Sequence, residues 1–213
     1  MSIRIKLCGM TRPPDAALAS SLGADAVGMI FYEKSARNIS IAQARDLILE
    51  LNPLCSAVAV VVNPEPVFVE SLLSQLDIQL IQFHGDEPAS FCEQFKMPYI
   101  KAIRMNVDTR LADIRKEYAR ARALLLDTFD KNLVGGTGRT FDWNLLDHDG
   151  LDETAESLHK PELMLAGGLG PDNAAAAIKR TGICSIDINS GVETEPGIKD
   201  HDKIRAVMKL AKA

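Results

Sequence analysis

Short hydrophobic runs alternate with amphipathic segments along this chain. The first run, residues 3–8, reads IRIKLC, so that its aliphatic side chains fall on one face and Arg4, Lys6 and Cys8 fall on the other. A period of two is typical of a β-strand. A helix is predicted over residues 13–22, because two prolines open that segment and Gly23 follows it.

The same alternation recurs to the end of the chain. Strands are predicted at residues 3–8, 26–31, 57–62, 78–84, 99–104, 123–127, 162–166 and 185–189. Helices are predicted at residues 13–22, about 40–51, 66–76, from about 88, 108–120, from about 141, from 171 and 200–211. Ser40 and Gln43 have the spacing of a capping box, and Pro171 takes a favoured first helical position. A glycine-bearing loop is expected over residues 128–140 and a solvated acidic segment over residues 147–156.

Eight strand–helix units require parallel pairing with right-handed crossovers. No Pro/Ser-rich linker or break in composition divides the units. The pattern therefore predicts one α/β domain over residues 1–213, a compact (β/α)₈ TIM barrel. An open doubly wound sheet is the structural alternative, but the first strand–helix turn, CGMTR, lacks the G-x-G-x-x-G pattern of that class.

Composition narrows the possible partners. The net charge of −5 argues against nucleic acid, and it means that an anionic substrate depends on local positive features. The longest aliphatic run, residues 57–62, is too short to span a bilayer, and no leader pattern precedes the first strand. Four scattered cysteines form no C-x-x-C pair and are interpreted as free thiols. We therefore expect a cytoplasmic protein with no membrane partner.

Polar residues gather where the predicted strands end, which is where barrel enzymes build their active sites. These residues are Cys8, Gln82, His84, Asp127, Asp187, Asn189 and Ser190. Each alone has an ordinary structural explanation, such as a buried thiol or a loop cap. Together they indicate a site, because unpaired buried polar groups are costly. Cys8 and Asp127 end the first and sixth strands, so they should face each other across the barrel mouth, as a base and an acid would.

Two glycine turns follow the last two strands. Gly167 and Gly168 end the seventh strand, and Ser190 and Gly191 follow the eighth. Glycines expose backbone N–H groups, and a short helix after the eighth strand would add its positive end, so a phosphate site is predicted there. In the loop after the second strand, Arg37 is a candidate for gripping a carboxylate, with a solvated cationic loop as the alternative.

These residues stand in motifs that occur together and in order. The motifs are KLCGMTR, GADAVGMIFYEKSARNIS, QFHGDE, LLLDTF, GGTGRTFDW, LAGGLGPDN and DINSGVE followed by PGIKD. With them the sequence resembles the phosphoribosylanthranilate isomerase family of tryptophan biosynthesis, over about residues 6–201. The resemblance implies an Amadori rearrangement of N-(5-phosphoribosyl)anthranilate, a small-molecule phosphosugar–anthranilate substrate, to a carboxyphenylamino-deoxyribulose phosphate.

The resemblance also implies roles for the site residues. Cys8 would be the general base, Asp127 the general acid and Arg37 the contact to the anthranilate carboxylate. The other substrate contacts implied are Gln82, His84, Gly167, Gly168, Asn189, Ser190 and Gly191. At Asn189 a smaller residue is expected in many relatives. The iminium intermediate acidifies the proton to be moved, so no metal or organic cofactor is expected. Both a monomer and a homodimer stay open.

One energetic difficulty accompanies these roles. Reference pKa values near 3.9 for aspartate and 8.5 for cysteine favour a carboxylate and a thiol. Moving that proton to give an acid and a thiolate costs roughly 6 kcal/mol without environmental help. Nearby cations and a helix N-terminus are expected to favour the Cys8 thiolate.

Three other functions are considered. A histidine-pathway Amadori isomerase should have an aspartate where this chain has Cys8. A ribulose-phosphate epimerase should have a His-rich metal cluster. A barrel that only binds phospho-ligands would not need both Cys8 and Asp127.

Overall fold

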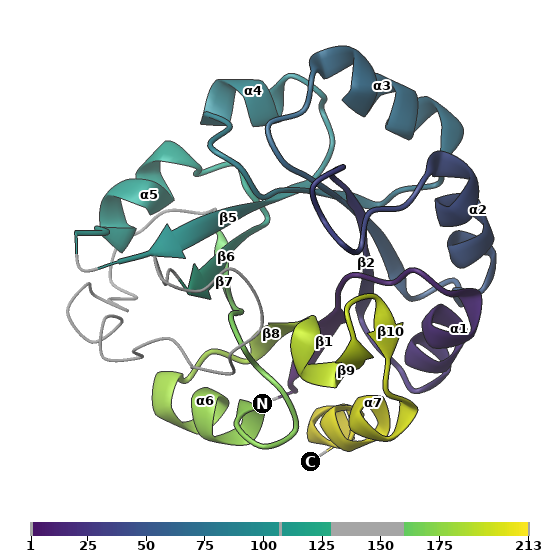
Figure 1. The fold of residues 1–213 in the computed structure, drawn as a ribbon. Helices are drawn as coiled ribbons and strands as arrows, with labels where there is room; N and C mark the ends of the chain where they lie inside the picture. Colours follow the sequence, from purple (N-terminus) through teal and green to yellow (C-terminus); the bar gives the residue numbers. More distant parts are fainter. Residues whose placement is uncertain (1, 107, 129–159, 213) are drawn as a thin grey trace.

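Eight strands form a closed barrel in the computed structural model, which describes residues 2–106, 108–128 and 160–212. Each strand pairs in parallel with the next, and β8 returns to β1 (Figure 1). The strands are β1 (Arg4–Leu7), β2 (Ala26–Phe31), β3 (Ser56–Val61), β4 (Leu80–Phe83), β5 (Tyr99–Met105), β6 (Ala123–Thr128), β7 (Glu162–Leu165) and β8 (Ser185–Ile188). The predicted (β/α)₈ barrel is confirmed, and every strand lies within two residues of its predicted ends.

The helices form a ring around the barrel (Figure 1). They are α1 (Pro13–Ser21), α2 (Ile41–Leu49), α3 (Pro66–Gln75), α4 (Ala89–Glu93), α5 (Leu111–Glu117), α6 (Ala174–Thr181) and α7 (His201–Met208), followed by the 3₁₀ turn η3 (Leu210–Lys212). The capping box at the start of α2 is confirmed, since Ser40 and Gln43 bond reciprocally. The predicted helix from residue 141, the acidic segment 147–156 and nearly all of the loop 128–140 lie outside the described residues.

The predicted start of α6 at Pro171 is wrong. The helix begins at Ala174, because the side chain of Asn173 closes a turn in front of it. Asn173 Oδ1 accepts from the Gly170 N–H at 2.8 Å, and its Nδ2 donates to the Gly168 carbonyl at 2.9 Å. Pro171 therefore lies in that turn and not in the first turn of the helix.

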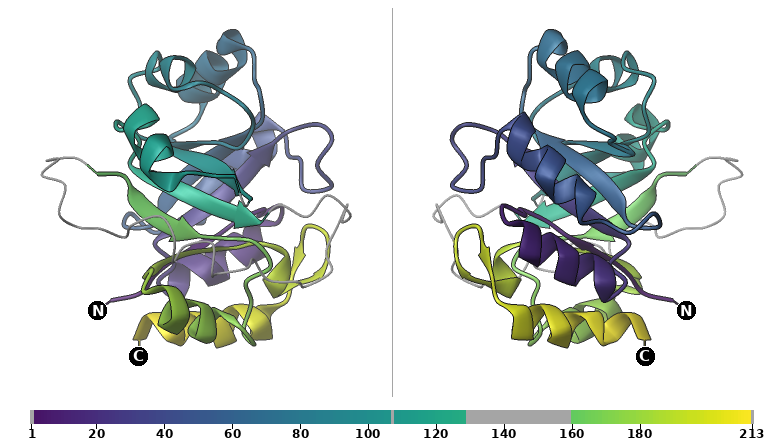
Figure 2. Two further views of the ribbon diagram at one scale, coloured as in Figure 1. Left: turned by 90° about the vertical axis from the view of Figure 1, so that its left-hand side faces the viewer. Right: turned by 90° about the vertical axis from the view of Figure 1, so that its right-hand side faces the viewer.

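A hairpin that the sequence did not predict follows β8. The 3₁₀ turn η2 (Ser190–Val192) supplies the expected short helix, and β9 (Glu193–Glu195) then pairs antiparallel with β10 (Ile198–Lys199). Figure 2 shows this hairpin at the end of the barrel opposite the N-terminus. It thus stands at the mouth formed by the C-terminal ends of the strands.

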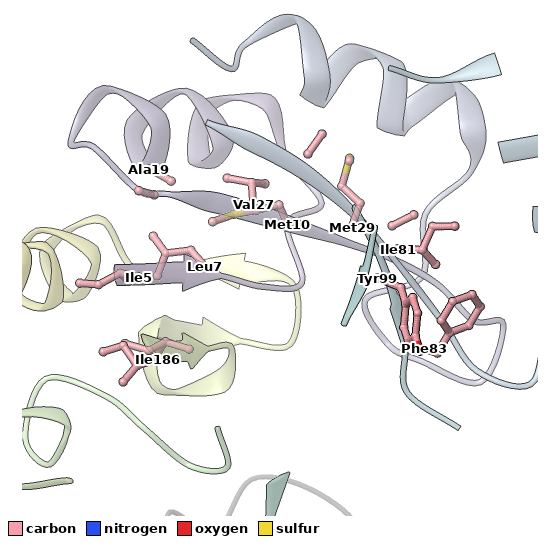
Figure 3. Close-up of a cluster of buried hydrophobic side chains, with 14 of the residues drawn as sticks. Ile5, Leu7, Met10, Ala19, Val27, Met29, Ile81, Phe83, Tyr99 and Ile186 are labelled. Carbon is pink, nitrogen blue, oxygen red and sulfur yellow. The ribbon is translucent and has the colours of Figure 1, made fainter. Parts of the chain in front are cut away.

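The alternation predicted for the strands separates two buried layers. Ile5 and Leu7 are fully buried in the layer between strands and helices, where Figure 3 shows them near Val27 and Ile186. Burial of such a side chain contributes about 1.5–3 kcal/mol. Cys8 instead packs inside the barrel with side chains of β2 and β3. Outward positions therefore stabilise the barrel, and inward positions near the mouth are available for chemistry.

No helix in the described part of the chain has the length and apolar character needed to cross a membrane.

Candidate active site

A cavity of about 400 Å³ opens at the mouth of the barrel. It is lined by nine of the ten residues predicted for the site: Cys8, Arg37, Gln82, His84, Asp127, Gly167, Gly168, Asn189 and Ser190. The tenth, Gly191, is not among the lining residues. A Cβ atom at Gly191 would collide with the Leu169 carbonyl oxygen, so this glycine lets the loops after β7 and β8 pack backbone to backbone.

Cys8 is held by its backbone at the tip of β1. Its N–H donates to the Ile188 carbonyl of β8 at 2.8 Å, and the Met10 N–H donates to the Gly28 carbonyl of β2 at 3.0 Å. Gly9 turns the chain with φ of +69°, and a Cβ there would lie 2.5 Å from Asn189 Oδ1. The glycine after the cysteine is therefore required both by the backbone conformation and by the close approach of β8.

A buried ion pair lies beside Cys8 in the barrel interior. Lys6 Nζ donates to Asp187 Oδ1 at 2.8 Å, and the two side chains are only 1% and 7% exposed. Lys6 and Asp187 are also register partners across the β1–β8 pairing that closes the barrel. The sequence placed Lys6 on the face of Cys8 and Asp187 on the face of Asn189, but their pairing was missed. The signal was available: both are charged residues at inward positions of the first and last strands.

The thiol of Cys8 is not a resting thiolate. Burial raises its pKa most, and the charge of Asp187 raises it further. Lys6 and Lys199 act in the opposite direction and do not overcome burial. The cations therefore favour the Cys8 thiolate, as expected, but the sequence did not show that burial would outweigh them, because a dry interior penalises the charged sulfur more than these cations stabilise it.

Three predicted site residues form one hydrogen-bonded chain. Gln82 Nε2 lies 2.8 Å from His84 Nδ1, and His84 Nε2 lies 3.2 Å from Asp127 Oδ2. With Gln82 donating to Nδ1, the imidazole proton sits on Nε2 and is donated to Asp127. The chain therefore orients the Asp127 carboxyl group. Among the described residues, Gln82 Oε1 is buried without a hydrogen-bond partner.

Arg37 already holds a carboxylate in this structure. Its Nε and Nη2 donate to the two oxygens of Glu193, at 2.8 and 2.5 Å. Lys199 Nζ donates to the same Glu193 at 2.9 Å and to Asn189 Oδ1 at 3.1 Å. Burial alone would raise the pKa of Glu193, but these two cations hold it below its ordinary value. Glu193 and Lys199, both on the unpredicted hairpin, were missed by the sequence analysis.

The turn after β7 lines the cavity with two glycines. Gly167 and Gly168 have φ of +83° and +66°, a region that favours glycine. Ser190 lines the same cavity from the start of η2. Both glycine turns therefore border the cavity that Cys8 and Asp127 line.

Comparisons with known proteins agree with this geometry. A family model described as N-(5'phosphoribosyl)anthranilate (PRA) isomerase matches residues 5–210. The N-(5'-phosphoribosyl)anthranilate isomerases of Cellvibrio japonicus and Legionella pneumophila are 42% and 44% identical to this chain. The first alignment covers 99% of this chain and 94% of the relative, and the second covers 97% and 96%.

Two solved structures are similar over the same length, each alignment covering 99% of this chain and 98% of the other. The phosphoribosyl anthranilate isomerase of Thermotoga maritima is 37% identical, with a TM-score of 0.82. A second structure of such an isomerase, in complex with reduced 1-(o-carboxyphenylamino)-1-deoxyribulose 5-phosphate, is 35% identical, with a TM-score of 0.78.

Proposed function

The chain belongs to the N-(5'-phosphoribosyl)anthranilate isomerase family, which performs the isomerase step in tryptophan biosynthesis, and we propose that Cys8 is its catalytic base and Asp127 its catalytic acid. The observation that carries this assignment is the cavity of about 400 Å³, which both side chains line from non-adjacent strands. A volume of that size suits a small phosphosugar conjugate.

The reaction needs one proton given and one proton taken. Asp127 in its protonated form donates to the ribose ring oxygen as the bond between that oxygen and C1 breaks, which leaves an iminium ion. Cys8 as a thiolate then removes the proton on C2, and the resulting enolamine tautomerises to the aminoketose. Substrate and product are isomers, so no atom is lost and no electron is exchanged with an outside group.

The protonation states limit the rate. Burial keeps Cys8 a thiol, so the form with a thiolate and a protonated Asp127 is a minor population. Between the pKa values of such an acid and base, the population of the minor form is independent of pH. We therefore expect kcat/KM to be flat around neutral pH. On the alkaline side, kcat/KM should fall above the pKa of the Cys8 thiol, which is raised.

His84 and Gln82 are proposed as positioning residues and not primarily as substrate contacts. Their hydrogen-bonded chain ends on Asp127 Oδ2, and it fixes the direction of the carboxyl group. The His84 and Asp127 side chains are 30% and 29% exposed and line the cavity, so the pair can meet a ligand there.

Arg37 is proposed to bind the anthranilate carboxylate by its remaining edge. Glu193 occupies Nε and Nη2, so Nη1 is the part of the guanidinium proposed to meet the ligand in the cavity that Arg37 lines. Glu193 pairs with both Arg37 and Lys199, so these three groups together carry one net positive charge. The glycine turns, with Ser190, would hold the phosphate at the cavity wall formed by the loops after β7 and β8.

The wider setting is part of the same proposal. The whole of residues 1–213 is taken as one barrel domain, in line with the family match over residues 5–210. We expect a cytoplasmic enzyme of a small-molecule substrate, without nucleic acid or membrane partners, in line with its net charge of −5. A homodimer is possible beside a monomer, since the Thermotoga maritima relative is described as dimeric. Light scattering of the purified protein distinguishes the two.

The decisive experiment follows the fluorescence of freshly generated phosphoribosylanthranilate. Its decay should accelerate with this protein and with Cys92→Ala, a control at another buried thiol, but not with Cys8→Ala. Coupling to the next enzyme of the pathway identifies the product. Full activity in Cys8→Ala would remove Cys8 from the chemistry, and no acceleration by the unmodified protein would indicate a barrel that only binds its ligand.

A further inference from the structure

The buried pair Lys6–Asp187 has no part in the roles assigned so far. Both side chains lie inside the barrel, at positions where apolar residues would pack. Replacing a buried ion pair by apolar side chains is often neutral or stabilising, so stability alone does not account for the pair. Its position next to Cys8 suggests a use.

The ammonium group and the sulfur lie against the same point of β2. A Cβ atom added at Gly28 would lie 2.6 Å from Cys8 Sγ and 3.1 Å from Lys6 Nζ. The charge of Lys6 lowers the pKa of the Cys8 thiol, while Asp187 binds the same ammonium from the β8 side. The ammonium of Lys6 thus contacts the Asp187 carboxyl group and lies close to a thiol that must lose its proton.

We propose that Lys6, held in place by Asp187, is a positioning residue whose ammonium stabilises the negative charge on Cys8 while the thiolate acts as the base. The proposal rests on the catalytic role proposed for Cys8. Asp187 sets the limit of the effect: it fixes the ammonium in position, and its own charge opposes the thiolate.

The local charge count supports this arrangement. Lys6 and Asp187 together are neutral, whereas Arg37, Lys199 and Glu193 together carry one positive charge. Loss of the Cys8 proton therefore makes these six groups neutral as a set. Two cations lower the pKa of the Cys8 thiol. Lys6 acts from β1, the strand that Cys8 follows, and Lys199 acts from β10.

The charged and titratable groups around Cys8 come from several elements. They are Lys6 on β1, Asp187 on β8, Arg37 after β2, Lys199 on β10 and, around the cavity, His84, Arg104 and Asp127. Removing Lys6 and removing Asp187 changes the local charge in opposite directions. This opposition separates an electrostatic role from a packing role.

The first test is the rate of alkylation of Cys8 by iodoacetamide as a function of pH, read by mass spectrometry of the peptide that contains Cys8. In Lys6→Met we expect the rate at about pH 8 to fall about tenfold or more, because an opposite charge nearby shifts a pKa by about 1–3 units. In Asp187→Asn we expect a rise of similar size. The double variant Lys6→Met/Asp187→Asn, which leaves no unpaired buried charge, should be slower than the unmodified protein.

A matched control is available on the other side of the barrel wall. Lys101 and Glu87 form a second buried pair, also at 2.8 Å. Lys101→Met/Glu87→Gln should leave the alkylation profile of Cys8 unchanged. Equal profiles in Lys6→Met and Asp187→Asn, or changes of the same sign, would overturn the proposal and assign the pair to packing.

The second test is the pH profile of kcat/KM in Lys6→Met. The plateau should fall about tenfold for each unit by which the thiol pKa rises, and the alkaline limb should move to higher pH. A lower plateau with an unmoved limb would indicate structural damage instead. If the alkylation shifts occur but Cys8→Ala keeps its turnover, the charge coupling stands and the proposed base fails, so the two failures are distinguishable.

Discussion

The barrel contains two buried groups built from the same three kinds of residue, and only one of them borders the cavity. The inner triad consists of Lys6, Asp187 and Cys8. The outer triad consists of Lys101, Glu87 and Cys92. In both, the ammonium and the carboxylate are 2.8 Å apart and a buried cysteine lies beside the pair.

The outer triad has its hydrogen bonds satisfied by the backbone. Lys101 Nζ also donates to the Gly85 carbonyl at 2.6 Å, and the Glu87 carboxylate accepts from the N–H groups of Asn63 and Gly85. These bonds close the turn after β4, outside the strands. Burial raises the pKa of Cys92 to about 12, so that thiol keeps its proton.

The inner triad has fewer hydrogen-bond partners, and two of its side chains face the cavity. Among the described residues, Asp187 is bonded by Lys6 alone, and both Asp187 and Cys8 line the cavity. Residue types therefore do not distinguish a structural triad from a functional one. Two things distinguish them. The functional triad is open to a ligand in the cavity, and its ammonium lies beside a thiol that can lose its proton.

The largest expected effect on catalysis is the difference between replacing Cys8 and replacing Cys92. Cys8→Ser should lower kcat by about 10²–10⁴-fold with little change in KM, because a hydroxyl is a far weaker base than a thiolate. Cys92→Ser should leave kcat within about twofold, since its thiol reaches no substrate. Steady-state kinetics of both variants measures this, and near-normal turnover in Cys8→Ser would contradict the account.

Lys101→Met should have the largest effect on stability. It leaves Glu87 as a buried charge without its cation, which costs about 3–5 kcal/mol in the free energy of unfolding. Urea denaturation measures the loss. Arg120→Ala is the matched control: that side chain pairs with Glu93 at 3.3 Å but is 79% exposed, and such pairs contribute about 0–1 kcal/mol. Equal losses would show that the outer pair is not structural.

Gly28→Ala tests the close approach that characterises the inner triad. The added methyl group would lie 2.6 Å from Cys8 Sγ, so the thiol has to move. A displacement of this kind should lower kcat/KM by about tenfold to a hundredfold. Gly182→Ala, where no atom lies within 4 Å but φ is +71°, should cost stability only. Unchanged kinetics in Gly28→Ala would mean that the position of the sulfur is not critical.

The smallest effect concerns the rim of the cavity above the inner triad. Arg37→Ala should raise KM about tenfold and change kcat less, because it removes a charged hydrogen bond that the substrate makes before and during reaction. Arg37→Lys keeps the charge but loses the bidentate geometry, so its KM should lie between that of the unmodified protein and that of Arg37→Ala. An unchanged KM in Arg37→Ala would refute the carboxylate contact.

The fold and much of the site were predictable because both depend on local alternation and on strand order. A period of two placed Lys6 and Cys8 on one face of the first strand, and the position of polar groups at strand ends indicated Cys8, His84 and Asp127 as site residues. Given a closed barrel, β1 and β8 are neighbours. The pairing of Lys6 with Asp187, 181 residues apart, was therefore within reach of the sequence.

The rest depends on three-dimensional detail. Arg37 meets Glu193 across 156 residues, through a hairpin whose short strands give no hydrophobic pattern. The resting state of Cys8 depends on how deeply it is buried, which outweighs the cations that the sequence reveals. Likewise, the start of α6 depends on the side chain of Asn173, whose bonds compete with a helical turn.

The central claim is that the charge of the inner triad, unlike that of the outer triad, is coupled to the proton of Cys8. Selective ¹³C labelling of the cysteine Cβ atoms allows each thiol to be titrated by NMR in one sample. In Asp187→Asn, the Cys8 pKa should fall by about 1–3 units while the Cys92 signal stays that of a thiol over the same range. In Glu87→Gln, the Cys8 titration should not move. A Cys8 titration that is the same in the unmodified protein and in Asp187→Asn would contradict the account.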